Sequence, residues 1–389
     1  MGAVLEIPTA AALMAQASER AGGLTNFGQP TFLDGLNVFL QSIRDDGGFT
    51  QAAATEYTAS FVGRLVIRLQ VEEWYRTHPE IEQGTVEKPL MITGLPRTGT
   101  SAFASILSLE PGFRCPRMWE QGSPVPPPIL GEEATDPRRV AAKARLREMQ
   151  ERGDEQMTMH LHELDSTSED VPILGYEFKA QSFTTPTPSY HAWWRESDMR
   201  PAYGYLLRIC KLLQSRRPPN RWLFKAPHYV FHLEHVLAAF PDARFVVTHR
   251  DPVKTIPSWA SLLSSLQPKG SLERVGPAVL AARAAEHQAI GMRRMIEARA
   301  RIGQDRFLDV HHHEFVADPM GVLERVYDFT GMTLEAETRR RMLTWADDNK
   351  PGTRGKHVYT AEQFGLTERG LREQFAFYTD TYGVKLERI

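Results

Sequence analysis

Short apolar runs alternate with helix-like patterns over most of the chain. Runs bounded by proline, glycine or charged residues predict buried strands at 89–94, 221–225, 243–249 and 306–311. Helical patterns follow three of these strands, after Thr100, over 229–239 and from about Pro252. This alternation predicts an α/β fold, in which helices flank a parallel sheet and ligands bind at the carboxyl ends of its strands.

Two regions fall outside the strand–helix alternation. Residues 1–88 are predicted to form a mostly helical region packed on the core, ahead of a main domain over 89–389. An insertion at about 115–205 interrupts that domain. Within the insertion, residues 136–165 are predicted to form a charged, amphipathic helical stretch. The segment 182–202, which contains several prolines, is expected to be irregular or lid-like.

The composition narrows the class of protein. The 389 residues carry a formal net charge of -2, with 42% hydrophobic and 24% charged residues, which is typical of a globular chain and unsuited to non-specific nucleic-acid binding. The two cysteines, Cys115 and Cys210, have no metal-like spacing and favour a reducing compartment. The N-terminus lacks the basic region of a signal peptide, and no run reaches the roughly 18 apolar residues of a membrane span. We therefore expect a cytoplasmic protein with no transmembrane segment and no nucleic-acid partner.

The stretch Gly94 to Ser101, GLPRTGTS, has the glycine spacing of a phosphate-binding loop between a strand and a helix. Glycines let the backbone curl so that its N–H groups and the helix N-terminus face an anion. A nucleotide triphosphatase needs lysine directly after the second glycine, where this chain has Thr100, and its basic residue is Arg97, inside the loop. The loop therefore predicts a P-loop-like anion site without the lysine of a kinase; a purely structural glycine turn is the alternative.

This loop resembles the 5′-phosphosulfate loop of the sulfotransferases that use 3′-phosphoadenosine 5′-phosphosulfate (PAPS), in the arginine-containing form of the bacterial and protein-tyrosine members. The segment 240–252 is similar to the family's 3′-phosphate element, with Arg250 and, eight residues later, Ser258. A later loop at 352–359 resembles the basic, glycine-containing loop that closes over the nucleotide. The resemblance implies that the nucleotide is bound by Arg97, Thr98, Gly99, Thr100, Ser101, Arg250, Ser258, Arg354, Gly355 and Lys356.

The resemblance also implies the reaction: sulfuryl transfer from PAPS to a hydroxyl on a small acceptor, with release of 3′-phosphoadenosine 5′-phosphate (PAP) and no metal. The acceptor would be a lipid, steroid, aromatic or sugar alcohol, bound by the insertion. Arg97 and Lys225 are candidates to neutralise the leaving phosphate, Lys225 because the strand it ends is similar to the family's strand with a catalytic lysine.

The identity of the general base stays open between three residues. Glu169 lies in Ser168-Glu169-Asp170, which resembles an acidic element of the bacterial subgroup and ranks first. His228 ranks second: many family members have a histidine two residues after the lysine, but this chain has Pro227 at that position and His228 one position later. Glu120 ranks third.

Other features carry weaker expectations. The run His311 to His313 invites a metal hypothesis, but neighbouring side chains on a strand alternate faces and cannot readily share one ion. The aromatic residues Phe183, Tyr190, Trp193 and Trp194 either line an acceptor pocket or pack a lid. The competing functions are a nucleotide kinase or NTPase and a nucleotide-binding module without catalysis.

Overall fold

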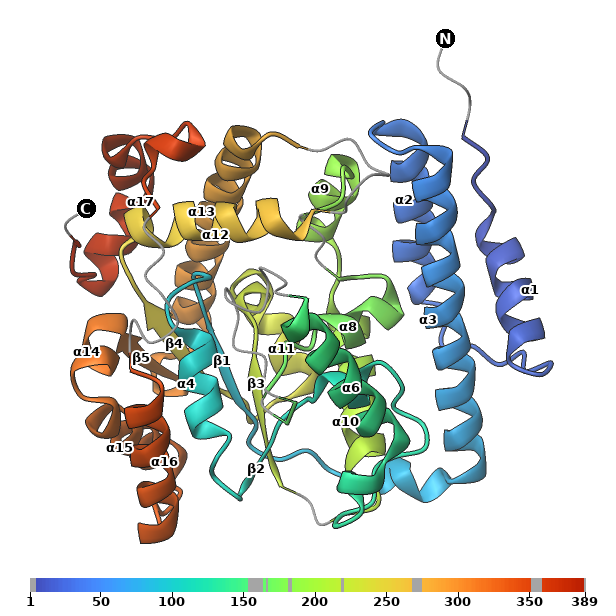
Figure 1. Cartoon of the computed structure of the whole chain (residues 1–389), viewed down its shortest axis with the longest axis horizontal. Coiled ribbons are helices and arrows are strands. Elements are labelled where there is room, and N and C mark those ends of the chain that lie inside the picture. The colour runs from blue at the N-terminus through green and yellow to red at the C-terminus, as the bar shows by residue number, and fades with distance from the viewer. Residues whose placement is uncertain are drawn as a thin grey trace.

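The computed structural model describes residues 5–152, 164–165, 167–180, 184–217, 220–267, 275–350 and 359–387. A parallel sheet with the strand order β2-β3-β1-β4-β5 lies in the middle of the molecule (Figure 1). Its strands are β1 (Leu90–Gly94), β2 (Phe113–Arg114), β3 (Arg221–Lys225), β4 (Arg244–His249) and β5 (Phe307–His311). The predicted strands and their parallel arrangement are confirmed, and β2 is a strand that the sequence did not reveal.

Helices account for most of the remaining chain. The α-helices before β3 are α1 (Ala10–Arg20), α2 (Phe32–Asp45), α3 (Gln51–Thr77), α4 (Thr100–Leu107), α5 (Met118–Gln121), α6 (Pro137–Glu151), α8 (Val171–Leu174), α9 (Pro188–Glu196) and α10 (Arg200–Gln214). Those after β3 are α11 (Leu233–Ala239), α12 (Pro252–Leu266), α13 (Pro277–Ile302), α14 (His312–Ala317), α15 (Pro319–Thr330), α16 (Ala336–Asp348) and α17 (Glu368–Tyr382). Short 3₁₀ helices are η1 (Pro79–Gln83), η2 (Glu133–Thr135), η3 (Gly175–Glu177), η4 (Pro227–Phe231), η5 (Gln304–Arg306) and η6 (Glu362–Phe364).

Side chains alternate between the two faces of the sheet, and each face has its own core. Leu90 and Ile92 of β1 pack in a cluster with residues of α4, α15 and α16. Met91, between them, belongs to a larger cluster with α10, α11 and α13. Successive side chains of a strand point to opposite faces, so a sheet covered on both sides needs apolar residues at every position. This explains why the strands appear in the sequence as continuous apolar runs.

The N-terminal helices share the larger core. Leu36 of α2 and Leu65 of α3 belong to the same buried cluster as Phe224 of β3. Figure 1 shows α1, α2 and α3 on the side of the molecule opposite α14, α15 and α16. The helical nature predicted for residues 1–88 is confirmed for its described part, and these helices pack on the insertion rather than standing apart.

Two local predictions were wrong. The segment 182–202 was expected to be irregular or lid-like, but its described part contains α9 and the start of α10 and is therefore largely helical. Pro188 and Pro201 lie in the first turns of these helices, where a backbone N–H would have no partner within the helix, so proline is tolerated there. The helix expected over 229–239 is split into η4 and α11. Within the described ranges, no helix has the length and apolar character needed to cross a membrane.

Candidate functional site

The loop after β1 is shaped by glycines that cannot be replaced without strain. Gly94 has a φ of 129°, and a Cβ there would lie 2.4 Å from the carbonyl oxygen of Thr248 on the neighbouring strand β4. Gly99 has a φ of 88° and directly precedes α4. The first N–H groups of a helix lack intrahelical partners, so α4 presents donors and a positive dipole end at the sheet's carboxyl edge. A loop with this geometry can hold an anion.

Arg97 joins the loop to the end of the neighbouring strand. Its backbone is left-handed, with a φ of 67°, and its Nε donates to Oγ of Ser258 on α12 at 3.1 Å. Nη1 of Arg250, which follows β4, lies 3.5 Å from the carbonyl oxygen of Arg97. Burial lowers the pKa of Arg97, and the Arg250 guanidinium contributes in the same direction. Two guanidinium groups and a hydroxyl from distant parts of the sequence thus meet at one place.

Arg250 is held by the C-terminal part of the chain. Its Nε and Nη2 donate to the two carboxylate oxygens of Glu387, at 2.8 and 3.1 Å. This bidentate contact fixes the orientation of the guanidinium and leaves Nη1 directed at the loop.

These groups line one cavity of about 220 Å³, which we call the nucleotide cavity after the ligand that the sequence predicts for it. Of the residues predicted to bind nucleotide, it is lined by Arg97, Gly99, Thr100, Ser101, Arg250 and Ser258. A curled loop with exposed N–H groups, two cations and several hydroxyls is a donor set for a ligand with more than one phosphate group. The residues present therefore fit a phosphorylated adenosine nucleotide such as PAPS or PAP.

The remaining predicted nucleotide ligands are placed differently. Thr98 is 2% exposed, and its hydroxyl donates to the Leu95 carbonyl oxygen at 2.8 Å and lies 2.6 Å from Oγ1 of Thr248. Its side chain therefore braces the loop from inside and faces away from the cavity. Arg354, Gly355 and Lys356 lie outside the described residues.

Lys225 and Glu169 form an ion pair at the edge of the nucleotide cavity. Nζ of Lys225, the last residue of β3, lies 2.9 Å from Oε1 of Glu169 and 3.4 Å from Oγ of Ser101. The lysine side chain is 7% exposed and that of the glutamate 36% exposed. The ammonium group of Lys225 thus contacts both a partly exposed carboxylate and a hydroxyl of helix α4.

The second candidate base, His228, does not reach the cavity. It is 1% exposed, and its ring packs against those of Tyr203 and Tyr229. Its Nε2 lies 3.6 Å from Oδ1 of the equally buried Asp170, and burial lowers the pKa of His228 and raises that of Asp170. Pro227, two residues after Lys225, lines the cavity instead. His228 is the next residue of the turn η4, and its side chain points into the protein core.

The third candidate, Glu120, is also away from the cavity. It is fully buried, and its Oε2 accepts from Nη2 of Arg114 at 3.0 Å. This carboxylate thus forms a buried ion pair with the last residue of β2. Of the three candidate bases, Glu169 is the one that the structure brings to the cavity.

A second, larger cavity of about 400 Å³ adjoins the nucleotide cavity. The two share Ser101, Glu169 and Trp259, and the larger one also contains Lys225. Much of its wall is apolar and comes from α5, α6, α8 and α12. An acceptor bound here would meet the ion pair at the junction of the two cavities.

Four residues that line the nucleotide cavity had no role predicted from the sequence: Pro96, Pro227, Trp259 and His312. Trp259 follows Ser258 on α12 and lines both cavities. His312 belongs to the histidine run, and burial lowers its pKa to about 4, with the Arg250 guanidinium acting in the same direction. Its Cδ2 would lie 3.1 Å from a Cβ at Gly99. The sequence alone does not place His312 in the cavity; it lies there because β5, which it follows, pairs with β4 and ends beside it.

Several predicted features lie elsewhere. Tyr190 and Trp194 are 1% and 0% exposed and belong to the main core, and neither lines the larger cavity; Phe183 lies outside the described residues. Only His311 of the histidine run is on β5, while α14 begins at His312. Within the described ranges, no group of three or more histidine, cysteine or acidic residues is arranged to hold a metal ion.

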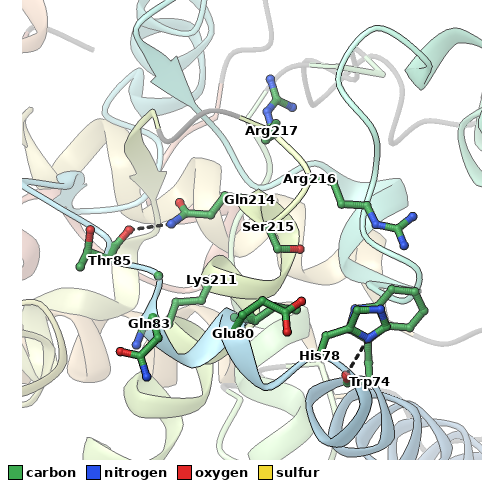
Figure 2. A pocket seen from close by; sticks show the side chains of 12 residues that line it. Trp74, His78, Glu80, Gln83, Thr85, Lys211, Gln214, Ser215, Arg216 and Arg217 are labelled. Atoms are coloured by element: carbon green, nitrogen blue, oxygen red, sulfur yellow. Dashed lines mark hydrogen bonds between the residues drawn. The ribbon is translucent and has the colours of Figure 1, made fainter.

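A separate pocket of about 380 Å³ lies between α3, η1 and the end of α10 (Figure 2). In it, Trp74 stacks on His78 with ring centroids 4.4 Å apart, and Gln214 donates to the carbonyl oxygen of Thr85 at 2.6 Å. These residues precede β1 and β3, so the pocket is at the amino edge of the sheet. It contains none of the residues that form the phosphate loop.

Comparisons with known proteins agree with this geometry. The model of the family described as "Sulfotransferase family" matches residues 89–336. The crystal structure of sulfotransferase STF9 from Mycobacterium avium is 30% identical, with a TM-score of 0.85 and 99% of each chain covered. That of sulfotransferase STF1 from Mycobacterium tuberculosis H37Rv is 28% identical, with a TM-score of 0.82, and covers 95% of this chain and 99% of its own.

A curated relative matches over a shorter stretch. The omega-hydroxy-beta-dihydromenaquinone-9 sulfotransferase Stf3 of Mycobacterium bovis is 24% identical over 161 residues, which is 41% of this chain. The match spans 40% of the length of that relative.

Proposed function

Because this chain belongs to the sulfotransferase family, we propose that it transfers a sulfuryl group from PAPS to the hydroxyl of a small-molecule acceptor and releases PAP. The observation that carries the proposal is the meeting of two cavities at Ser101 and Glu169. One cavity has the cations and N–H groups for a nucleotide, and the other has room for an acceptor. The ion pair of Lys225 and Glu169 lies between them.

The nucleotide supplies the activated sulfuryl group, and the protein's part is to position it and to manage charge and protons. We assign the loop N–H groups and Lys225 to the phosphate oxygen that becomes negative as the sulfur–oxygen bond breaks. Arg97, Arg250 and Ser258 are assigned to the nucleotide's phosphates. Donors aimed at developing charge in a site shielded from water contribute several kcal/mol to catalysis.

Glu169 is the proposed general base. Its carboxylate takes part in both cavities and is partly exposed, so it can accept the acceptor's proton as the hydroxyl oxygen attacks sulfur. Lys225, at 2.9 Å from its Oε1, holds this carboxylate at the junction while the acceptor is absent. His228 and Glu120 receive no role in proton transfer, because each is buried against its own carboxylate or guanidinium partner.

The reaction is tested by incubating the protein with labelled PAPS and a panel of alcohols, with product detection by mass spectrometry. We expect Glu169→Gln to retain PAP affinity and to lower kcat by about 10²–10⁴-fold. Lys225→Met should lower kcat by about 10²–10³-fold, the effect of removing one stabilising donor. PAP binding with no transfer to any acceptor would indicate a non-catalytic binding module, and Mg²⁺-dependent ATP turnover would indicate a kinase or NTPase.

The nucleotide contacts are tested separately by calorimetry with PAP. Arg97→Ala and Arg250→Ala should each weaken affinity by tenfold or more, since each removes a charge-assisted contact worth about 1.5–3 kcal/mol. The matched control is Arg369→Ala, whose side chain is 89% exposed on α17. If all three variants bind PAP equally, the assignment of this cavity to the nucleotide is wrong.

A further inference from the structure

The larger cavity differs in chemistry from the nucleotide cavity beside it. Its polar junction consists of Ser101, Glu169 and Lys225, which hydrogen-bond to one another through Lys225. Away from this junction, helices from different parts of the chain contribute apolar side chains, among them Trp119, Leu146 and Leu262. A ligand that reaches the ion pair must therefore place the rest of its structure against apolar side chains.

The cavity leaves apolar side chains open to water. Met118 is 62% exposed and Leu266 is 36% exposed, although both line the cavity. Exposed apolar groups around a concave site are typical of a surface that a ligand covers. Covering them removes apolar area from water, which favours binding in proportion to the area covered.

Among the described residues, the polar groups of this cavity are too few, and too localised, for a polyhydroxylated ligand. Beyond the junction, the described lining offers the hydroxyls of Ser105, Thr167 and Ser168 and one indole N–H each from Trp119 and Trp259. The Thr167 hydroxyl already has a protein partner, since it donates to the carbonyl oxygen of Ser168 at 3.5 Å. Hydroxyls of a sugar placed against the apolar walls would lose their hydrogen bonds to water without replacement.

We infer that the acceptor is an apolar alcohol, with its hydroxyl at the Lys225–Glu169 pair and a hydrocarbon body in the cavity formed by α5, α6, α8 and α12. This inference rests on the proposed function and selects one acceptor class within it. A cavity of about 400 Å³ is in the range that holds a ligand of roughly drug size. The reaction forms a bond between the alcohol oxygen and sulfur, breaks the bond between sulfur and the phosphate oxygen, and passes the hydroxyl proton to Glu169.

Helix α6 provides a clean way to test the cavity. Ala142 and Leu146 are one turn apart on its cavity side, whereas Val140 is 53% exposed and does not line the cavity. No residue of α6 is buried, so the helix tolerates substitutions without loss of the fold. Ala142→Trp fills the cavity, Leu146→Gln makes its wall polar, and Val140→Trp is the matched control.

The experiment compares straight-chain primary alcohols from butanol to dodecanol, with sorbitol against hexanol as a pair of equal carbon number. Acceptor binding is measured by calorimetry on the PAP complex, and turnover is measured with labelled PAPS. We expect affinity to rise about threefold to fourfold for each added methylene until the cavity is full. Sorbitol should be neither bound nor sulfated.

Ala142→Trp should shorten the longest alcohol accepted and Leu146→Gln should flatten the dependence on chain length, while PAP affinity stays unchanged in both. Sulfation of sorbitol in preference to hexanol, or equal behaviour of Ala142→Trp and Val140→Trp, would overturn the inference and leave the proposed function intact. Chain-length-dependent binding that Ala142→Trp abolishes, but without any sulfuryl transfer, would support the ligand class and overturn the proposed function.

Discussion

A buried arginine connects the N-terminal helices to the segment that carries the proposed base. Nη1 of Arg68 on α3 lies 2.6 Å from Oε1 of Glu177 in η3, and the two side chains are 0% and 2% exposed. The same guanidinium donates to the backbone carbonyl groups of Phe27, Gln29 and Tyr176. One side chain thus holds together a loop before α2, helix α3 and the chain just after α8.

Arg68→Met removes the charge while keeping most of the apolar stem, so the change isolates the polar contacts. The carboxylate of Glu177 then stays buried and keeps, among the described side chains, the hydrogen bond from the Thr31 hydroxyl at 2.8 Å from its Oε2. Breaking a buried pair from one side costs about 3–5 kcal/mol, against a typical total of about 5–15 kcal/mol for the free energy of unfolding. We expect Arg68→Met to lose about 3–5 kcal/mol.

The loss should depend on pH in a defined direction. Burial raises the pKa of Glu177, and the Arg68 guanidinium opposes this rise. Without Arg68, the carboxyl group takes up a proton more readily, and a neutral buried carboxyl group costs less than a charged one. The deficit of Arg68→Met relative to the wild type should therefore shrink as the pH falls.

Urea unfolding followed by circular dichroism measures the effect. Arg76→Met is the control, because Arg76 pairs with Glu73 on the same helix but the two side chains are 66% and 36% exposed. Exposed pairs contribute at most about 1 kcal/mol, so this control should unfold nearly as the wild type does. The reasoning is refuted if Arg68→Met loses no more stability than Arg76→Met.

Three further predictions concern pH, the loop and salt. Burial lowers the pKa of His232 from 6.5 to about 2, so between these pH values the unfolded chain binds a proton that the folded chain does not. The wild type should therefore lose about 1.4 kcal/mol of stability for each pH unit below 6.5 through this residue. His232→Phe should lack this contribution, which urea midpoints measured across pH will reveal. Gly94→Ala should destabilise by about 1–3 kcal/mol through its strained φ alone, whereas Gly63→Ala, which has open space on α3, should gain up to about 1 kcal/mol in the same assay. PAP affinity should fall as sodium chloride is raised, because mobile ions screen the cationic cavity; calorimetry that finds no salt dependence would argue against phosphate recognition by arginine.

The sequence predicted the fold well where burial makes the pattern continuous. The predicted membership in the sulfotransferase family and the predicted P-loop-like α/β fold are confirmed. The central strands could be predicted because they are covered on both faces and therefore appear in the sequence as continuous apolar runs. β2 has only Phe113 and Arg114 and pairs with β3 at the edge of the sheet, too short for any periodicity. α9 was missed because the prolines of the segment 182–202 were taken as helix breakers, although a first-turn proline such as Pro188 is compatible with a helix.

Topology explains which parts of the candidate site were predictable. Arg97 follows β1 and Arg250 follows β4, and these strands are neighbours in the sheet, so parallel pairing alone brings their ends together. The partnership of Lys225 and Glu169 has no such basis, because Glu169 lies in an insertion whose path the periodicity does not define. The inward turn of His228 was equally hidden, since a one-residue offset in a tight turn decides which side chain faces the cavity.

The position of Glu169 follows from contacts made by its immediate neighbour. Asp170 is fully buried, and its Oδ2 accepts from the hydroxyl of Tyr229 at 2.6 Å, in the turn that follows Lys225. The two consecutive acids therefore contact the end of β3 twice, one through Lys225 at the cavity and one through Tyr229 in the core. Nε2 of Gln121 also donates to the Glu169 carbonyl oxygen at 3.0 Å, which fixes the backbone between them. These contacts restrain the backbone on both sides of Glu169, and a group preorganised by its supporting contacts needs little rearrangement to reach its working geometry.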